Sequence, residues 1–166
     1  MKLLAIDPGT ESSGFVIIDT DDMSVTSSDS SISNNALLDW VIGYDVDHMA
    51  VEMIASYGMS VGKTTFETCV WIGRFIQRWL SSNGETDYTL VYRKDVKLTL
   101  CQSMRAKDAN IRQELLDRYP ATGGGKTPQV GTKKDPGPLF GVSSHSWSAL
   151  AVAHTWVDTK RIEGMI

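Results

Sequence analysis

Residues 1–18, which read MKLLAIDPGTESSGFVII, decide the fold. A short apolar run at 3–6 leads directly to Asp7, and a segment containing Pro8 and Gly14 separates it from a second apolar run at 15–18. A continuous apolar run is typical of a strand buried on both faces, so the pattern predicts a β-hairpin whose first strand ends in a carboxylate where the sheet meets solvent. The alternative is that Asp7 is an ordinary turn residue before proline.

A second acidic residue has the same kind of position. Residues 46–52, VDHMAVE, predict another short strand, and this strand ends on Glu52. Carboxylate oxygens are the ligands that hard divalent cations prefer. Asp7 and Glu52, each ending a central strand, therefore predict a divalent-metal site.

The rest of the chain predicts an α/β fold. Expected strands lie at 2–7, 14–19, 23–28, 46–52 and 88–93, and expected helices at 35–43, 64–82, 94–102, 106–119 and 143–158, with a polar segment up to residue 35. Three antiparallel strands followed by strands that alternate with helices indicate a five-stranded mixed sheet flanked by helices. The 166 residues, 42% of them hydrophobic, suit a single domain spanning 1–166. Residues 120–142, rich in glycine and proline, predict a long flexible basic loop or hairpin.

The order of these motifs resembles the RuvC-type Holliday junction resolvases of the RNase H-like superfamily, and among them the small phage and prophage proteins. Four segments carry the resemblance: the hairpin around DPGT (7–10), the strand ending at Glu52, the run RKDVKL (93–98) with RAKDANIR (105–112), and the helix SHSWSALAVA (144–153). The resemblance implies an RNase H-like fold and a homodimeric endonuclease. Such an enzyme would resolve four-way and related branched DNA by paired nicks, in DNA recombination and repair.

The resemblance also implies a site for two Mg²⁺ ions, for which Mn²⁺ is expected to substitute. Asp7 would bridge both ions and Glu52 would hold one. The late helix contributes two further groups in the family, and those positions read His145 and Ser148 here, three apart on one helix face. His145 is disfavoured as a cation by the helix dipole, so it would serve as a neutral metal ligand or help to activate the attacking water.

Ser148 departs from the family pattern, which has an aspartate at this position. A serine cannot supply that charge, so the second metal site would lose a ligand or take water instead. Asp108 could supply a carboxylate if its helix passed near the site, although an exposed helix face is the simpler place for it. A serine introduced to disable cleavage is another alternative. A second function class therefore stays open, a branched-DNA-binding protein of the same fold with little or no cleavage.

The late helix also needs a residue to begin it. Ser143 or Ser144 is expected to cap its first turn.

Charge is distributed unevenly along the chain, whose net charge is −4. Residues 1–60 carry ten acids against one base, whereas residues 93–134 carry ten bases against four acids. A basic tract can be a solvated face, but beside an acidic metal site it is expected to neutralise phosphates. The basic residues expected to contact DNA are Lys63, Lys107, Arg112, Lys126, Lys133 and Lys134.

The loop at 53–64 is expected to overhang the active site. Its Tyr57 could stack on or wedge against unpaired bases at a branch point, or could be a buried loop anchor.

The helix at 64–82 is apolar on almost all sides. One stripe contains Phe66, Cys69, Val70, Gly73, Ile76 and Leu80, and a second, nearly opposite, contains Trp71, Phe75 and Trp79. A helix of this kind must be buried on two sides. We expect the first stripe to pack on the sheet, and the second to pack either on the last helix of the domain or, as the resemblance implies, across a twofold dimer interface.

Several other functions are not expected. Residues 58–64, GMSVGKT, resemble a Walker A loop but have three residues between the glycines where the motif needs four. The DPGT segment also resembles the phosphate loop of actin-like and sugar-kinase ATPases. Those proteins close two such domains around a nucleotide, whereas 166 residues provide only one. The apolar stretches are far short of ~20 residues, which predicts a cytoplasmic protein without membrane contact. The resemblance implies that the cell is bacterial or phage-infected. Cys69 and Cys101 are expected to be reduced core residues.

Overall fold

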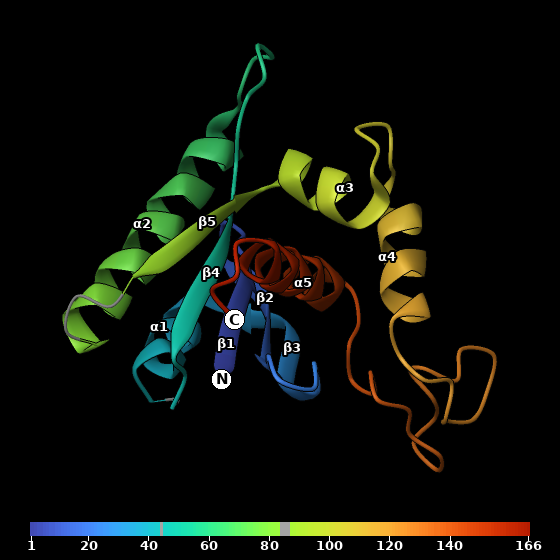
Figure 1. Ribbon diagram of the computed structural model, residues 1–166. Coiled ribbons are helices and arrows are strands. Elements are labelled where there is room, and N and C mark those ends of the chain that lie inside the picture. Colours follow the sequence, from blue (N-terminus) through green and yellow to red (C-terminus); the bar gives the residue numbers. More distant parts are fainter. Residues whose placement is uncertain (44, 84–86) are drawn as a thin grey trace.

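The computed structural model describes residues 1–43, 45–83 and 87–166, and it has one five-stranded mixed sheet in the order β3-β2-β1-β4-β5 (Figure 1). Strand β1 (Lys2–Asp7) pairs antiparallel with β2 (Ser12–Asp19) and parallel with β4 (His48–Met53). The edge strands are β3 (Val25–Ser33) and β5 (Tyr88–Tyr92). The predicted α/β fold, with three antiparallel strands followed by parallel ones, is confirmed.

Helices cover both faces of the sheet. On one face lie α1 (Asn34–Gly43) and α2 (Lys63–Asn83), and on the other lies α5 (His145–Ile162). Helices α3 (Arg93–Cys101) and α4 (Asp108–Asp117) pack on α5 from the side away from the sheet (Figure 1). Among the described residues, no helix is both long and apolar enough to cross a membrane.

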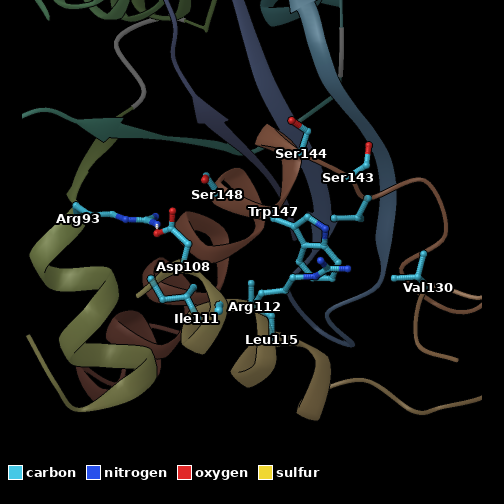
Figure 2. A pocket seen from close by; sticks show the side chains of 12 residues that line it. Arg93, Asp108, Ile111, Arg112, Leu115, Val130, Ser143, Ser144, Trp147 and Ser148 are labelled. Atoms are coloured by element: carbon cyan, nitrogen blue, oxygen red, sulfur yellow. Dashed lines mark hydrogen bonds and ion pairs between the residues drawn. The ribbon is translucent and has the colours of Figure 1, made fainter. Parts of the chain in front are cut away.

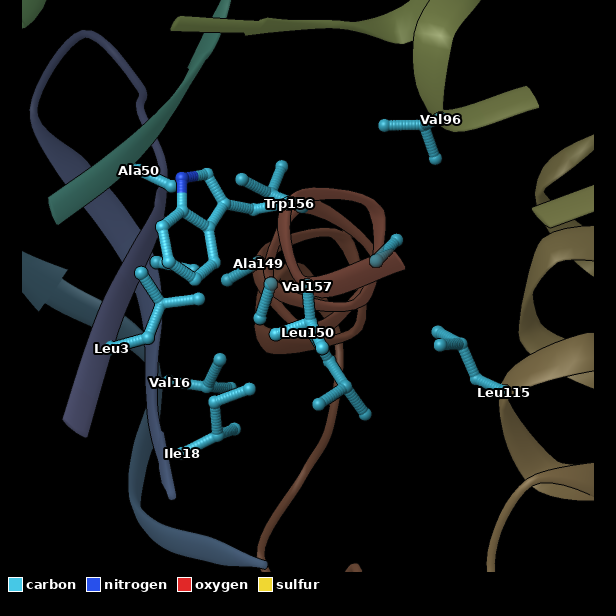
Figure 3. Close-up of a cluster of buried hydrophobic side chains, with 14 of the residues drawn as sticks. Leu3, Val16, Ile18, Ala50, Val96, Leu115, Ala149, Leu150, Trp156 and Val157 are labelled. Carbon is cyan, nitrogen blue, oxygen red and sulfur yellow. The ribbon is translucent and has the colours of Figure 1, made fainter. Parts of the chain in front are cut away.

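Strand β1 is buried on both faces, as its apolar run predicts. Its side chains alternate, so that Leu3 belongs to the core under α5 while Leu4 and Ile6 belong to the core under α1 and α2. Figure 3 shows the first of these cores, with Leu3, Val16 and Ile18 of the sheet facing Leu150 of α5. Helix α5 is thereby fixed directly against β1 and β2, and this packing sets where its first residue lies.

Helix α2 packs on the sheet mainly through the stripe that was not expected to do so, although Ile76 and Leu80 of the expected stripe also pack partly against the same core. Phe75 and Trp79 are 0% and 1% exposed, in the core beneath the sheet, and Trp71 packs partly against that core. Phe66 and Val70, expected to face the sheet, are instead 61% and 62% exposed. The physical reason is that both stripes are apolar, and the aromatic stripe buries more area against the sheet. The predicted dimer contact through Trp71, Phe75 and Trp79 is therefore wrong.

Several element boundaries differ from the predicted ones. The third strand, expected at 23–28, runs from Val25 to Ser33, because the polar residues that follow position 28 form an edge strand with half-exposed side chains rather than a loop. Helix α4 is shorter than the predicted 106–119, and α5 begins and ends later than 143–158. Both cysteines are free and lie in helices as expected, but they are half-buried rather than core residues.

The predicted cap of α5 is only partly right. Ser144 occupies the N-cap position, with a left-handed φ of 42°, but its side chain makes no capping hydrogen bond. The hydroxyl of Ser146 instead accepts a hydrogen bond from the backbone N–H of Ser143 (2.8 Å) and donates one to the carbonyl of Ser143 (2.7 Å).

The segment at 120–142 folds back on itself. Backbone N–H groups of Gly123, Gly124 and Gly137 donate to the carbonyls of Pro128, Asp135 and Val130 at 2.9–3.0 Å. Gly131 has a φ of 75° and faces Gly137 so closely that an added Cβ would lie 2.2 Å from its nitrogen. Buried Leu139 and Val142 anchor the end of the segment in the core under α5. A loop and a hairpin were the two predicted alternatives for this segment, and the hairpin is closer to the structure. The flexibility of the segment stays a prediction.

Candidate active site

Asp7 and Glu52 lie side by side at the ends of two adjacent parallel strands. The register of β1 and β4 pairs Ile6 with Val51, so the next residue on each strand is one of the two acids. Their side chains are 17% and 14% exposed. The two carboxyl groups are near enough to share a hydrogen bond. The sequence-predicted acidic pair is thus brought together, and the reading of Asp7 as a mere turn residue is not favoured.

This environment makes ionisation of the pair costly. Burial raises the pKa of Asp7 above its usual value, while the hydrogen bond and charge of His145 act in the opposite direction. Burial, and then the negative charge of Asp7, raise the pKa of Glu52 to about 7. A cation bound to the two carboxylates would offset this cost.

His145 is the third member of the cluster. As the first residue of α5, it places its Nδ1 3.0 Å from Oδ2 of Asp7. An ionised Asp7 accepts hydrogen bonds, so Nδ1 is the donor in this contact, and Nε2 is the other ring nitrogen of an exposed side chain.

Gly14 permits this contact. A Cβ built at that position would lie 2.6 Å from the carbonyl carbon of His145, so only glycine lets the start of α5 come this close to β2.

The turn after Asp7 is held by two buried polar residues. The hydroxyl of Ser13 accepts a hydrogen bond from the N–H of Gly9 (3.2 Å) and donates to Oδ1 of Asn34 (2.6 Å). The amide of Asn34 in turn donates to the carbonyl of Gly9 (2.9 Å). The role of Ser13 and Asn34 in holding this turn is not predicted from the sequence, since each residue lies in a polar stretch without a motif.

Arg93 is the cation nearest to the acidic pair. Its guanidinium nitrogen Nη1 lies 3.6 Å from Oε1 of Glu52, while Nη2 forms an ion pair with Asp108. Nη1 is buried and makes no hydrogen bond. The sequence places Arg93 in the RKDVKL segment (93–98) but predicts no role for it. Asp108 does come near the site, as one alternative required, but its carboxylate contacts Arg93 and is exposed.

Ser148 does not join the cluster in the same way. It lines a cavity together with Arg93, Asp108 and Trp147 (Figure 2). The smaller hollows lined by Asp7, Glu52 and His145 do not include it. The predicted face shared by His145 and Ser148 is therefore divided between two neighbouring depressions.

Tyr57 lies where the overhanging loop was expected. It lines a hollow of about 270 Å³ with Asp7, Glu52 and Arg93. Its side chain is exposed, so the alternative of a buried loop anchor is wrong. Lys63, the first residue of α2, is exposed and forms an ion pair with Glu67 (3.3 Å).

The other predicted DNA contacts are exposed cations. Lys107 immediately precedes α4, and the Arg112 guanidinium lies 4.9 Å from the ring centre of Trp147. In the described parts of the chain, no ion pair involves any of five basic residues, namely Lys107, Arg112, Lys126, Lys133 and Lys134.

The donor set fits a hard divalent cation. Within residues 1–43, 45–83 and 87–166, no group of three or more His, Cys, Asp and Glu side chains is already arranged around a common metal position. Two adjacent carboxylates, one with its pKa raised to about 7 by burial and by the other's charge, nevertheless form an oxygen-rich pair that a cation would neutralise. The imidazole of His145 lies beside this pair, with Nδ1 3.0 Å from Asp7.

The sheet order and the helices on its two faces match a RuvC-like, RNase H-like fold. The structure resembles a Thermus thermophilus RuvC structure with a TM-score of 0.71 and 15% identity, over 98% of this chain and 97% of that one. It also resembles T. thermophilus RuvC in complex with Holliday junction substrate, with a TM-score of 0.69 and 14% identity, over 99% and 98% of the two chains. No family profile and no curated protein matches the chain. The likeness to phage and prophage proteins stays a prediction.

Proposed function

We propose that this protein is a structure-selective endonuclease that resolves four-way (Holliday) and related branched DNA by metal-dependent phosphodiester hydrolysis. The observation that carries the proposal is the meeting of Asp7, Glu52 and His145 at the ends of β1 and β4 in a RuvC-like fold. A structure with the same fold contains a Holliday junction substrate, which supports branched DNA as the partner.

Each residue of the cluster has a proposed role. Asp7 and Glu52 would hold Mg²⁺, or Mn²⁺ in its place, and the bound cations would supply Lewis-acid activation of water and neutralisation of the phosphate charge. His145 fixes the orientation of the Asp7 carboxylate through Nδ1 and offers Nε2 as a metal ligand or as an acceptor for a water proton. Arg93 supports the ionised form of Glu52.

The proposal is tested with a synthetic four-way junction. Nicking is measured with Mg²⁺, and binding is measured separately in Ca²⁺ or with a chelator. Mg²⁺-dependent nicks support the nuclease. Binding without cleavage would instead favour the second candidate, a branched-DNA-binding protein, to which the serine at position 148 lends weight because it removes a carboxylate from the family pattern.

Alanine at position 145 is expected to lower nicking more than alanine at position 148. His145 contacts Asp7, so His145→Ala should lower nicking by about a hundredfold, the upper end of the usual loss for a metal ligand or its support. Ser148→Ala should stay within about twofold. Rates are compared at saturating and limiting Mg²⁺.

A carboxylate added beside the site provides the complementary test. Ser148→Asp should lower the Mg²⁺ concentration needed for half-maximal nicking if that position reaches the metals. An unchanged Mg²⁺ dependence would mean that position 148 faces away from the metals or that another residue already fills the role.

The exposed cations are proposed to bind phosphates of the junction arms. Phosphate contacts carry no sequence information, so alanine at Lys126, Lys133 and Lys134 together should weaken binding to junctions of any sequence. The slope of log K against log salt should fall by about 0.9 for each lost contact. Lys2→Ala, at the start of β1 and thus the opposite end from Asp7, is the matched control. An unchanged slope in the triple variant would place the DNA elsewhere.

We propose a homodimer that uses the exposed stripe of α2, defined by Phe66, Val70 and Gly73. Two large apolar side chains that are each more than 60% exposed on one helix face are typical of a contact surface. The double substitution Phe66→Asp and Val70→Asp should convert a dimer into a monomer in sedimentation equilibrium, while the fold is retained. Arg78→Asp, exposed on another side of α2, should not. A monomeric parent protein would refute this contact.

A further inference from the structure

A cavity of about 670 Å³ lies between α4, the start of α5 and the segment at 120–142 (Figure 2). At one end its lining includes Arg93, Asp108 and Ser148, and Arg93 also contacts Glu52 of the acidic pair. At the other end lie Trp147 and Arg112 (Figure 2). The cavity is therefore joined to the candidate active site through a single side chain.

The far end of the cavity is a stacking platform. The Arg112 guanidinium lies over the ring of Trp147, 4.9 Å from its centre, as a cation–π pair. The indole packs partly against the core under α5, which limits its movement, whereas Arg112 is exposed. Aromatic rings and arginine planes are the two kinds of surface on which proteins stack unpaired nucleobases.

The chemistry of the remaining lining suits a base with its phosphate. Ile111, Leu115 and Val142 provide an apolar wall, and the hydroxyls of Ser143 and Ser144 provide polar groups beside it. Two arginines face a single acid, Asp108, which is already paired with Arg93, so the lining carries a net positive charge. The volume lies in the range of small-ligand sites, which is enough for one nucleotide and too small for a duplex.

We propose that this cavity receives one unpaired nucleotide of the branched DNA, with its base stacked on Trp147 and Arg112 and its phosphate toward Arg93. The proposal rests on the proposed function and names the part of the substrate that the chain would hold next to its acidic pair. Extruding a base is least costly where pairing is already interrupted, so the cavity would favour branch points over continuous duplex.

The test pairs a protein change with a DNA change. Binding is measured in Ca²⁺ with junctions that carry one abasic nucleotide at successive positions around the branch point. On the intact junction, Trp147→Ala should weaken binding about tenfold, in keeping with the loss of one stacked base. At one abasic position the parent protein should lose the same factor, and Trp147→Ala should cause no further loss there. Trp147→Phe, which retains an aromatic face, should restore most of the binding.

The outcomes separate the two proposals. If the parent binds junctions but Trp147→Ala binds as tightly as the parent, or its loss adds fully to the abasic loss at every position, the nucleotide cavity is refuted and the endonuclease proposal stands. If the parent binds no branched DNA, both are refuted. Thermal unfolding of each variant checks that the fold is intact, and the Phe variant provides the comparison if the Ala variant is unstable.

Discussion

Asp7→Asn is expected to abolish Mg²⁺-dependent nicking of a four-way junction, by at least about a thousandfold, while junction binding in Ca²⁺ or chelator is retained. The substitution keeps the size of the side chain and removes the charge that would help to hold the cation, and a metal site contributes several kcal/mol to such a reaction. Removing a negative charge does not weaken phosphate contacts, so binding should be unchanged or slightly tighter. Single-turnover cleavage and binding by mobility shift measure the two effects separately.

The matched control is Asp39→Asn, which changes the same chemical group at an exposed position of α1. It should nick at the parent rate. Retained nicking by Asp7→Asn would remove Asp7 from the mechanism, and equal losses of binding and cleavage would show that the substitution acts on the fold or the DNA surface instead.

Gly14→Ala is expected to lower nicking by about a hundredfold, although residue 14 carries no functional group. The added Cβ would lie 2.6 Å from the carbonyl carbon of His145, so the start of α5 must move away from β2 and carry the imidazole away from Asp7. A displacement of about 1 Å at a catalytic group is enough for a loss of this size. Overpacking at a tight contact should also lower the free energy of unfolding by ~1–3 kcal/mol, measured by urea denaturation.

Gly62→Ala separates the local clash from a general effect of glycine replacement. A Cβ at Gly62 meets no atom within 4 Å, so this variant should match the parent in both nicking and stability. Parent-like nicking by Gly14→Ala would mean that the His145 contact with Asp7 is not needed for cleavage.

The fold could be predicted from the sequence where a residue pattern is compatible with only one kind of packing. The apolar run before Asp7 has no polar face and is too short for a helix, so it indicates a strand covered on both sides, and the structure places it at the centre of the sheet. Helix α2 is different, since both of its stripes are apolar. Which of them meets the sheet is decided by the shape and area of the strands beneath, and these are not visible in the helix sequence.

The candidate site divides in the same way. Asp7 and Glu52 could be predicted because a strand end in sequence is also a sheet edge in space. Arg93 and Asn34 could not, because Arg93 acts on Glu52 and Asn34 acts on Gly9 through contacts between residues 41 and 25 positions apart. His145 and Ser148 line different depressions, and Ser148 shares its cavity with residues of α3 and α4, whose packing on α5 is not visible in the sequence of α5.

The most direct test of a paired, metal-dependent junction nuclease is cleavage of a supercoiled plasmid that extrudes a cruciform, with Mg²⁺ as the only divalent cation. A single nick relaxes the plasmid, so the cruciform is lost and no second nick can follow from a new binding event. Linear DNA therefore forms only when both nicks are made within one binding event. For a paired, metal-dependent junction nuclease, we expect linear product from the parent protein and none from Asp7→Asn. A parent protein that binds the cruciform but leaves the plasmid supercoiled in both Mg²⁺ and Mn²⁺ would contradict it.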